Sequence, residues 1–219
     1  MRHLQESYQR RLVIVDDEPI IRSLLAQRLG EVGFETHTAP DALSAKRLVA
    51  KVDPDALLVD LDLGDGPSGT ELISVLAAQN PALGFVLLTN YIPTQAEMKS
   101  APHIAYLSKR DVEGIDRVVA ALNSVMRDNS SDQETYLVPD SGPLSLLTAR
   151  QIAVLGMVAK GLSNSEIARQ RGVSVRAVEQ TVHRIYSALN IQEDERSSPR
   201  VLAARIYSSQ LGLRRGKPD

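Results

Sequence analysis

The sequence predicts two domains: an α/β domain with a doubly wound, five-stranded parallel sheet, then an all-α domain of four helices with a helix-turn-helix. In the first half of the chain, five short apolar segments rich in β-branched residues alternate with segments of helical spacing. Strands that are apolar throughout are typical of parallel sheets buried on both faces, and right-handed crossovers make such a sheet doubly wound. In the second half, apolar residues recur at helical spacing without further strand patterns.

The elements of the α/β domain follow from the apolar runs and from the residues that begin and end helices. Pro19 suits a first helical turn, Gly33 suits the end of that helix, and Asp111 suits the N-cap of the last helix. The expected strands cover residues 11–17, 34–39, 55–62, 84–90 and 103–109. The expected helices cover residues 19–33, 40–51, 68–79, 93–101 and 111–128.

Composition limits the classes of protein that are possible. The chain has 219 residues, enough for two domains, and 43% of them are apolar, enough for two cores. It has no cysteine, which excludes disulfides and cysteine-ligated metals. No apolar run reaches the roughly 18 residues of a membrane span. Residues 1–11 lack the apolar segment of a secretory signal. We therefore expect a cytoplasmic protein without a membrane partner.

Composition and charge also mark the boundary between the domains. Residues 128–143 are polar and contain Gly, Pro and Ser, so we expect a linker there. The expected units are an N-terminal extension at 1–10, a domain at 11–127 and a domain at 144–219. Up to residue 143 the chain carries 13 Lys and Arg against 21 Asp and Glu, whereas from residue 144 it carries 12 against 6. A basic second domain suggests a polyanionic partner such as nucleic acid.

Polar side chains follow four of the expected strands, each at the strand's carboxyl end. Asp16 and Asp17 end the first strand, Asp60 the third, Thr89 the fourth and Lys109 the fifth. In a doubly wound sheet these ends meet at one edge, where binding sites lie. Three carboxylates at one point imply a divalent cation, and Mg²⁺ takes few carboxylates while keeping waters for a phosphate. The set fits phosphoryl transfer, which needs positioning and charge neutralisation, with Asp60 as the nucleophile.

The string Asp60-Leu61-Asp62 allows two interpretations in phosphate chemistry. In a phosphatase of the haloacid-dehalogenase type, the first Asp is the nucleophile and the Asp two residues on is the general acid. In a receiver domain, a lone Asp stores a phosphoryl group as a signal. Such phosphatases place the pair near the start of the chain, usually followed by Gly and Thr or Val, whereas here Leu63 and Gly64 follow. The residues around this string favour the receiver interpretation, and the phosphatase remains the alternative.

The chain from about residue 10 to residue 127 resembles a bacterial response-regulator receiver domain, with the matching segments in the family's order and approximate spacing. One departure is Asn90, which follows Thr89 where the family usually has a small residue. It leaves open a regulator of this fold that works without phosphorylation. The matching segments are VDDE (15–18), LLVDLDLGDGPSGTEL (57–72), LLTN (87–90) and AYLSK (105–109).

The resemblance implies a role for each polar residue at this edge. A sensor histidine kinase donates the phosphoryl group, and Asp60 accepts it. Thr89 and Lys109 contact the phosphoryl group, and Tyr106 acts with Thr89 as a switch. The implied ligands of Mg²⁺ are Asp16, Asp17, Asp60 and the backbone carbonyl of Asp62.

Three helical segments between residues 147 and 190 predict a helix-turn-helix. Each opens with a Ser or Thr cap, and Gly161 and Gly172 end the first two. Two short helices joined by a turn with Gly, the second with a polar face, are typical of a DNA reader. Periodicity alone also fits another small helical bundle. The expected helices of this domain cover residues 147–161, 163–172, 174–190 and 197–213.

Residues 146–191 also resemble the LuxR-type (NarL/FixJ) DNA-binding domain. Ala177 and Thr181 depart from the family, which frequently has Thr and His at these positions. The resemblance implies double-stranded DNA as a partner. The matching segments are LTARQ (147–151), GLSN (161–164), EIA (166–168), GVS (172–174) and VE (178–179).

The third of these helices is the expected recognition helix. The family's base-reading positions fall on Glu179, Gln180 and His183. Gln can bond adenine and Glu can accept from cytosine. Arg176 and Arg184 are expected to contact phosphates, which position the helix without reading sequence. For each of these residues a solvated helix face is the alternative.

The last helix, expected from near Pro199, carries more apolar residues than one narrow stripe holds. One side of this helix should pack on the bundle. The apolar residues on its other side suggest a dimer contact, so we expect a homodimer at least when the protein is phosphorylated.

The expected protein is a phosphorylation-controlled, DNA-binding transcriptional regulator with a sensor histidine kinase as its partner, and not an enzyme.

Overall fold

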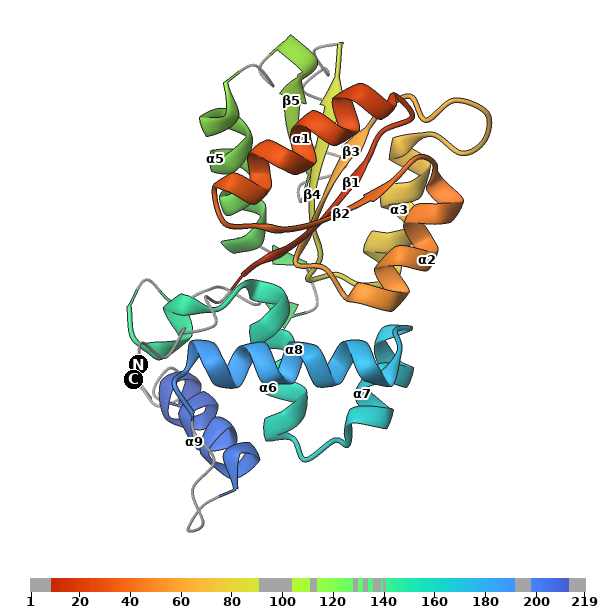
Figure 1. Ribbon diagram of the computed structural model, residues 1–219. Helices are drawn as coiled ribbons and strands as arrows, with labels where there is room; N and C mark the ends of the chain where they lie inside the picture. The colour runs from red at the N-terminus through yellow and green to blue at the C-terminus, as the bar shows by residue number, and fades with distance from the viewer. Residues whose placement is uncertain are drawn as a thin grey trace, which may run out of the picture.

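The computed structural model describes residues 9–90, 104–110, 114–127, 130–131, 134–135, 139, 141–191 and 198–212 (Figure 1). The predicted helix at 93–101, the predicted N-cap at Asp111 and residues 1–8 of the predicted N-terminal extension lie outside the described residues. The described part contains an α/β domain followed by a helical domain.

The α/β domain contains five parallel strands in the order β2-β1-β3-β4-β5. This is a doubly wound order whose switch point lies between β1 and β3. The predicted fold class of this domain is therefore confirmed. The strands are β1 (Arg11–Val15), β2 (Glu35–Ala39), β3 (Ala56–Asp60), β4 (Gly84–Thr89) and β5 (Ile104–Ser108).

Helices cover both faces of this sheet (Figure 1). In the described residues they are α1 (Pro19–Glu31), α2 (Ala42–Val52), α3 (Gly69–Gln79) and α5 (Ile115–Arg127). Successive residues of a strand point to opposite faces. Leu12 and Ile14 of β1 accordingly share a core with α1 and α5, whereas Val13 and Val15 share a core with α2 and α3. All four side chains are completely buried, as expected for a sheet covered on both sides.

Local signals begin and end these helices where the sequence places them. Pro19 opens α1, and Gly33, two residues beyond the last residue of α1, takes a φ of 100°, which glycine adopts without strain. Ser68 and Glu71 form a capping box at the start of α3, in which each side chain accepts from the other residue's backbone N–H.

The second domain consists of a short 3₁₀ helix, η2 (Pro143–Leu146), and four α-helices in the described residues. Thr148, Ser163 and Ser174 cap the first three α-helices, and Gly172 takes a left-handed conformation at the turn between the second and the third. The predicted four-helix arrangement with a helix-turn-helix is confirmed. The α-helices are α6 (Ala149–Ala159), α7 (Asn164–Arg171), α8 (Val175–Ala188) and α9 (Pro199–Gly212).

The segment predicted as a linker contains a small antiparallel pair, β6 (Ser130–Ser131) with β7 (Glu134–Thr135). The linker boundaries themselves stay a prediction. Among the described residues, no helix combines the length and the apolar character that crossing a membrane requires.

The helical domain packs against the end of the sheet where the strands begin (Figure 1). The backbone N–H of Ser174, the N-cap of α8, donates to the carbonyl of Ala50 in α2 at 3.0 Å. Arg11 at the start of β1 and Asp55 just before β3 also bond to the helical domain. The contact between the domains is therefore at the opposite end of the sheet from the predicted phosphoryl site.

Candidate functional site

Asp60 and Lys109 form the centre of the predicted site. Asp60 is the last residue of β3 and is 2% exposed. Lys109 directly follows β5, which is separated from β3 by β4. Its Nζ lies 2.7 Å from Oδ2 of Asp60. Because parallel strands end at the same edge, the fold brings a carboxylate and an ammonium group into contact from distant parts of the chain.

A second group of carboxylates follows β1. Asp16 is completely buried, whereas Asp17 and Glu18 are exposed, and oxygens of all three lie within 4.8 Å of one another. Nζ of Lys109 lies 3.4 Å from Oε1 of Glu18 and 4.0 Å from Oδ2 of Asp16. Lys109 therefore connects this acidic group to Asp60.

Burial and neighbouring charges together shift the pKa values of Asp16, Asp60 and Lys109. It raises the pKa of Asp16 to about 6, opposed by the hydrogen bond from the Glu18 N–H and assisted by the charge of Asp60. Burial also raises the pKa of Asp60, although the hydrogen bond and charge of Lys109 oppose it. Burial lowers the pKa of Lys109, but the contact with Asp60 and the charge of Asp16 outweigh it, so the net shift is upward. Burial disfavours the ionised forms of the Asp16 and Asp60 carboxyls, and a cation bound between them would stabilise those ionised forms.

The acidic group fits a hard divalent cation such as Mg²⁺. Its donors are oxygen atoms, which Mg²⁺ prefers. Oδ2 of Asp16 is buried and accepts no hydrogen bond within the part of the chain that the structure describes. The side chain of Asp62 is exposed, and its Oδ1 accepts from the Gly64 N–H at 3.2 Å. The role of the Asp62 carbonyl as a ligand stays a prediction.

We expect Mg²⁺ binding to weaken as the pH falls through about 6. The pKa of Asp16 is raised in the folded chain, so its carboxylate takes up a proton as the pH falls through that value. A proton competes with the cation for the same oxygens. By titration calorimetry the dissociation constant for Mg²⁺ should rise about ten-fold at about pH 5, one unit below that pKa. The Asp16→Asn variant should bind Mg²⁺ weakly without this pH dependence. An affinity of the wild-type chain that stays constant over this range would contradict the expectation.

The structure also places the two predicted switch residues near this edge. Thr89 is the last residue of β4, beside β3, and is 4% exposed. Tyr106 lies in β5 opposite Leu87 of β4 and is half-buried against the core shared with α2 and α3. Their roles in contacting a phosphoryl group and in switching stay predictions.

Two residues of the site were given no role by the sequence. Glu18 contacts Lys109, although the sequence assigned no function to this last residue of the segment VDDE. Gly69 opens α3, where a Cβ atom would clash with the carbonyl oxygen of Asp60, and its N–H donates to the carbonyl of Leu61 at 2.9 Å. Glycine therefore lets α3 pack closely against the end of β3. The signal for Gly69 lay inside the matching segment around Asp60, but its close contact is visible only in three dimensions.

The predicted DNA-contacting residues all lie on α8, and they fall into two groups. Arg176, Glu179 and His183 are exposed, as a DNA-reading surface requires. Gln180 and Arg184 are partly buried and bond to the α/β domain instead. The contact of each residue with DNA stays a prediction.

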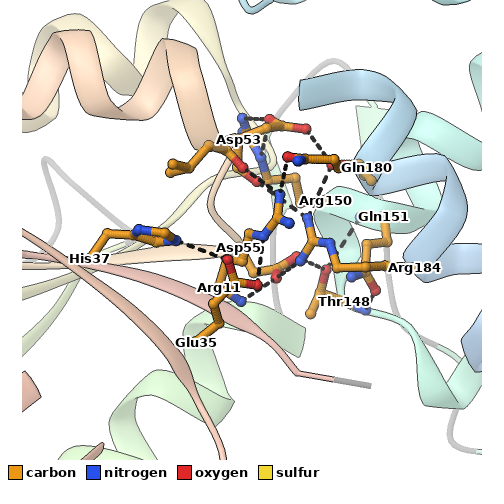
Figure 2. A network of polar contacts seen from close by, with 12 residues as sticks. Arg11, Glu35, His37, Asp53, Asp55, Thr148, Arg150, Gln151, Gln180 and Arg184 are labelled. Atoms are coloured by element: carbon orange, nitrogen blue, oxygen red, sulfur yellow. Dashed lines mark hydrogen bonds and ion pairs between the residues drawn. The ribbon is translucent and has the colours of Figure 1, made fainter. Parts of the chain in front are cut away.

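The contacts of Gln180 and Arg184 belong to a polar network between the two domains (Figure 2). Oε1 of Gln180 accepts from Nη1 of Arg11 at 3.2 Å. Oδ2 of Asp55 accepts from Nη1 of Arg184 at 2.9 Å and from the backbone N–H of Arg11 at 2.8 Å. Oδ1 of Asp55 accepts from the hydroxyl of Thr148 at 2.9 Å. In this conformation, part of the predicted DNA-reading surface is therefore covered by the α/β domain.

Asp53 forms the centre of the same network. Its carboxylate accepts hydrogen bonds from Arg150 of α6, from both terminal nitrogens of Arg171 of α7 at 3.0 and 2.9 Å, and from the hydroxyl of Thr181 of α8 at 2.8 Å. Asp53 is 1% exposed. Burial acts to raise the pKa of Asp53, but the charges of Arg150 and Arg171 outweigh it and hold that pKa far below its usual value. One carboxylate thus bonds to three helices of the other domain.

The sequence offered a signal for Asp53 and Asp55, but no function was assigned to them. The string Asp53-Pro54-Asp55 places two acids immediately before the apolar run at 56–59. Such residues lie at the amino end of a parallel sheet, where connecting loops are usually solvated. Only the packing of the second domain shows that these carboxylates are buried.

Comparison with known proteins agrees with the two-domain interpretation. Residues 12–120 match the family described as response regulator receiver domain, and residues 145–197 match the family described as bacterial regulatory proteins, luxR family. The chain is 27% identical over 222 aligned residues to the DNA-binding transcriptional activator DevR/DosR of Mycobacterium tuberculosis, covering 91% of this chain and 96% of that protein.

Two further proteins align with most of the chain. The chain is 29% identical over 201 residues to the oxygen regulatory protein NreC of Staphylococcus aureus, covering 83% of this chain and 92% of that protein. A solved structure of the RcsB response regulator of Salmonella typhimurium aligns with a TM-score of 0.44 and 16% identity, covering 94% of this chain and 99% of that one.

Proposed function

Because this chain belongs to the response regulators that join a receiver domain to a LuxR-type DNA-binding domain, we propose that Asp60 accepts a phosphoryl group from a histidine kinase and thereby controls DNA binding by α8. The observation that carries the proposal is the contact of Lys109 Nζ with Oδ2 of Asp60 beside a group of carboxylates. The chain then acts as a transcription regulator and not as an enzyme with its own substrate.

Each residue at this edge has a task in the transfer. Asp60 supplies the attacking oxygen, Lys109 neutralises charge on the phosphoryl oxygens, and the hydroxyl of Thr89 donates to one of them. Asp16 and Asp17, together with Asp60 and the carbonyl of Asp62, would hold Mg²⁺. When bound, Mg²⁺ neutralises the remaining negative charge of the phosphoryl group.

The proposed response is a separation of the two domains. Gln180 and Arg184 are bonded to Arg11 and Asp55 in this conformation, so these two predicted contacts with DNA need the domains to part. Tyr106 and Thr89 are the proposed switch at the other end of the sheet. The units involved are the extension 1–10, the receiver domain 11–127, the linker 128–143 and the DNA-binding domain 144–219. We propose that the protein works in the cytoplasm, as a homodimer at least when phosphorylated.

Sedimentation velocity tests the proposed switch. The chain is measured with and without beryllofluoride, a phosphoryl mimic, in the presence of Mg²⁺. We expect a compact monomer without the mimic and a dimer with it. The Asp60→Asn variant serves as the control, because it should not respond. An unchanged sedimentation profile of the wild-type chain, with the mimic shown to be bound, would contradict the proposal.

Substitutions on α8 test the assignment of DNA contacts. Gln180→Ala or His183→Ala should relax sequence preference by about 1–3 kcal/mol for each lost base contact. Binding is compared by fluorescence anisotropy on a preferred duplex and on a scrambled duplex at fixed salt. Arg176→Ala is the matched control, because loss of a phosphate contact should weaken binding equally on both duplexes. An equal loss on both duplexes for Gln180→Ala would show that Gln180 reads no base.

A further inference from the structure

Five polar side chains of the DNA-binding domain, here called the basic pocket, gather around two carboxylates of the receiver domain. The pocket is formed by the guanidinium groups of Arg150, Arg171 and Arg184 and by the hydroxyls of Thr148 and Thr181. Arg150 is 2% exposed and Arg171 is 7% exposed, so two of the three cations are deeply buried. The five residues come from α6, α7 and α8 and from the N-cap of α6, so the helix-turn-helix itself builds the pocket.

Two carboxylates of the receiver domain, Asp53 and Asp55, bond to the members of this basic pocket, and Figure 2 labels three of these members, Thr148, Arg150 and Arg184. Asp53 bonds to Arg150, Arg171 and Thr181. Asp55 bonds to the other two members of the pocket, Thr148 and Arg184. Every member of the pocket therefore donates to an oxygen that the other domain supplies.

The described part of the DNA-binding domain has no acidic group of its own to balance the pocket. Its acidic residues, within 141–191 and 198–212, are Glu166 and Glu179. Glu166 bonds to Arg169 on the exposed side of α7, and Glu179 is exposed on α8. Burial lowers the pKa of Arg171 to about 10, and the neighbouring charge of Arg150 adds to this effect while Asp53 opposes it. Among the described residues, the carboxylates that balance the three positive charges of the pocket are therefore Asp53 and Asp55 of the receiver domain.

We propose that this basic pocket is an oxyanion site that takes phosphate when the domains separate, and that Asp53 and Asp55 occupy it in the closed chain. A guanidinium fork matches the oxygens of a carboxylate and of a phosphate equally well. The pocket includes Arg184 and lies beside Gln180 on α8. The phosphate is therefore either part of a DNA backbone or free in solution. Binding of a DNA phosphate in the pocket rests on the proposed function of α8. Binding of phosphate from either source does not depend on phosphorylation of Asp60.

The first experiment measures binding of inorganic phosphate to the full chain without Mg²⁺, by titration calorimetry against chloride at equal ionic strength. The double substitution Asp53→Asn with Asp55→Asn empties the pocket, and Asn tolerates the left-handed backbone of Asp53, whose φ is 50°. Phosphate should bind this variant at least about ten-fold more tightly than the wild-type chain, in which the site is occupied. Adding Arg171→Gln should abolish the gain, whereas adding Arg169→Gln on the exposed side of the same helix should not.

Equal phosphate affinity of the wild-type and doubly substituted chains would overturn the proposal, as would a gain that survives Arg171→Gln. Because the double substitution also weakens domain docking, the wild-type chain supplies a second measurement. By small-angle X-ray scattering, phosphate should expand the wild-type chain more than chloride at equal ionic strength, since it competes with Asp53 and Asp55. Identical scattering in the two salts would also overturn the proposal.

A third measurement separates the two sources of phosphate. In the doubly substituted chain, the affinity for a duplex of random sequence is measured as a function of salt. If a DNA phosphate enters the pocket, Arg171→Gln should lower the slope of log affinity against log salt by about 0.9. If the slope is unchanged while inorganic phosphate binding is lost, the pocket takes free phosphate. If the doubly substituted chain binds inorganic phosphate but no duplex, the proposed function of α8 is contradicted and the pocket is not.

Discussion

Asp60→Asn is expected to abolish acid-labile labelling of the chain by a phosphodonor in the presence of Mg²⁺. Asn keeps the size of the side chain at the end of β3 but removes the nucleophilic oxygen and the negative charge that Lys109 contacts at 2.7 Å. Labelling is measured with a radioactive small-molecule phosphodonor, followed by acid and base treatment of the product. Labelling of the variant at the wild-type level would remove Asp60 from its proposed role.

Asp62→Asn is the matched control, because Asp62 is exposed and lies two residues after Asp60. In a receiver domain the Asp62 side chain takes no part in the transfer, so labelling should persist. In an Asp-nucleophile phosphatase, Asp62 would be the general acid, and its loss should stop turnover of a phosphate ester. The pair of variants therefore separates the two interpretations of the string Asp60-Leu61-Asp62.

Asp53→Asn is expected to open the unphosphorylated chain and to raise its affinity for DNA. Removing one partner from a buried ion pair costs about 3–5 kcal/mol, because the opposite charges are left uncompensated. If this cost falls on domain docking, the equilibrium between closed and open chains shifts by roughly two to four decades. Fluorescence anisotropy with duplex DNA, without a phosphodonor, measures the increase in affinity.

The control for this substitution is Asp116→Asn, which removes an exposed carboxylate from the first turn of α5. Its effect on DNA affinity should be small, because surface charges contribute little. The pKa of Asp53 is depressed in the folded chain, so its contribution to docking is present above its ordinary pKa and is lost only as the pH falls through acidic values. Unchanged DNA affinity of Asp53→Asn would show that the network does not hold the domains together.

Much of the fold could be predicted because it depends on local signals. The apolar runs of β1 and β3 are buried on both faces, and such runs belong to parallel strands. The helix caps at Thr148, Ser163 and Ser174 were visible as residue types beside apolar periodicity. The edge that gathers Asp16, Asp60 and Lys109 followed from strand direction, because parallel strands all end on the same side.

The contacts between domains could not be predicted in the same way. Gln180 and Arg184 have the composition and spacing of a DNA-reading face, yet they bond here to Arg11 and Asp55. The same guanidinium group serves a carboxylate or a phosphate, so the residue type does not reveal which partner occupies it. The close contact between Gly69, the first residue of α3, and the carbonyl oxygen of Asp60 was hidden too, because it depends on how α3 packs against the end of β3.

By itself, the sequence determined the order of the two domains, the class of each and the edge of the sheet where phosphoryl chemistry is possible. These properties depend on periodicity and on strand direction, which are local or are shared by every doubly wound sheet. Only the tertiary structure decided that Asp53 and Asp55 lie buried among Arg150, Arg171 and Arg184. The physical reason is that burial of a charge depends on which surface packs over it, and two domains joined by a linker can pack in many ways.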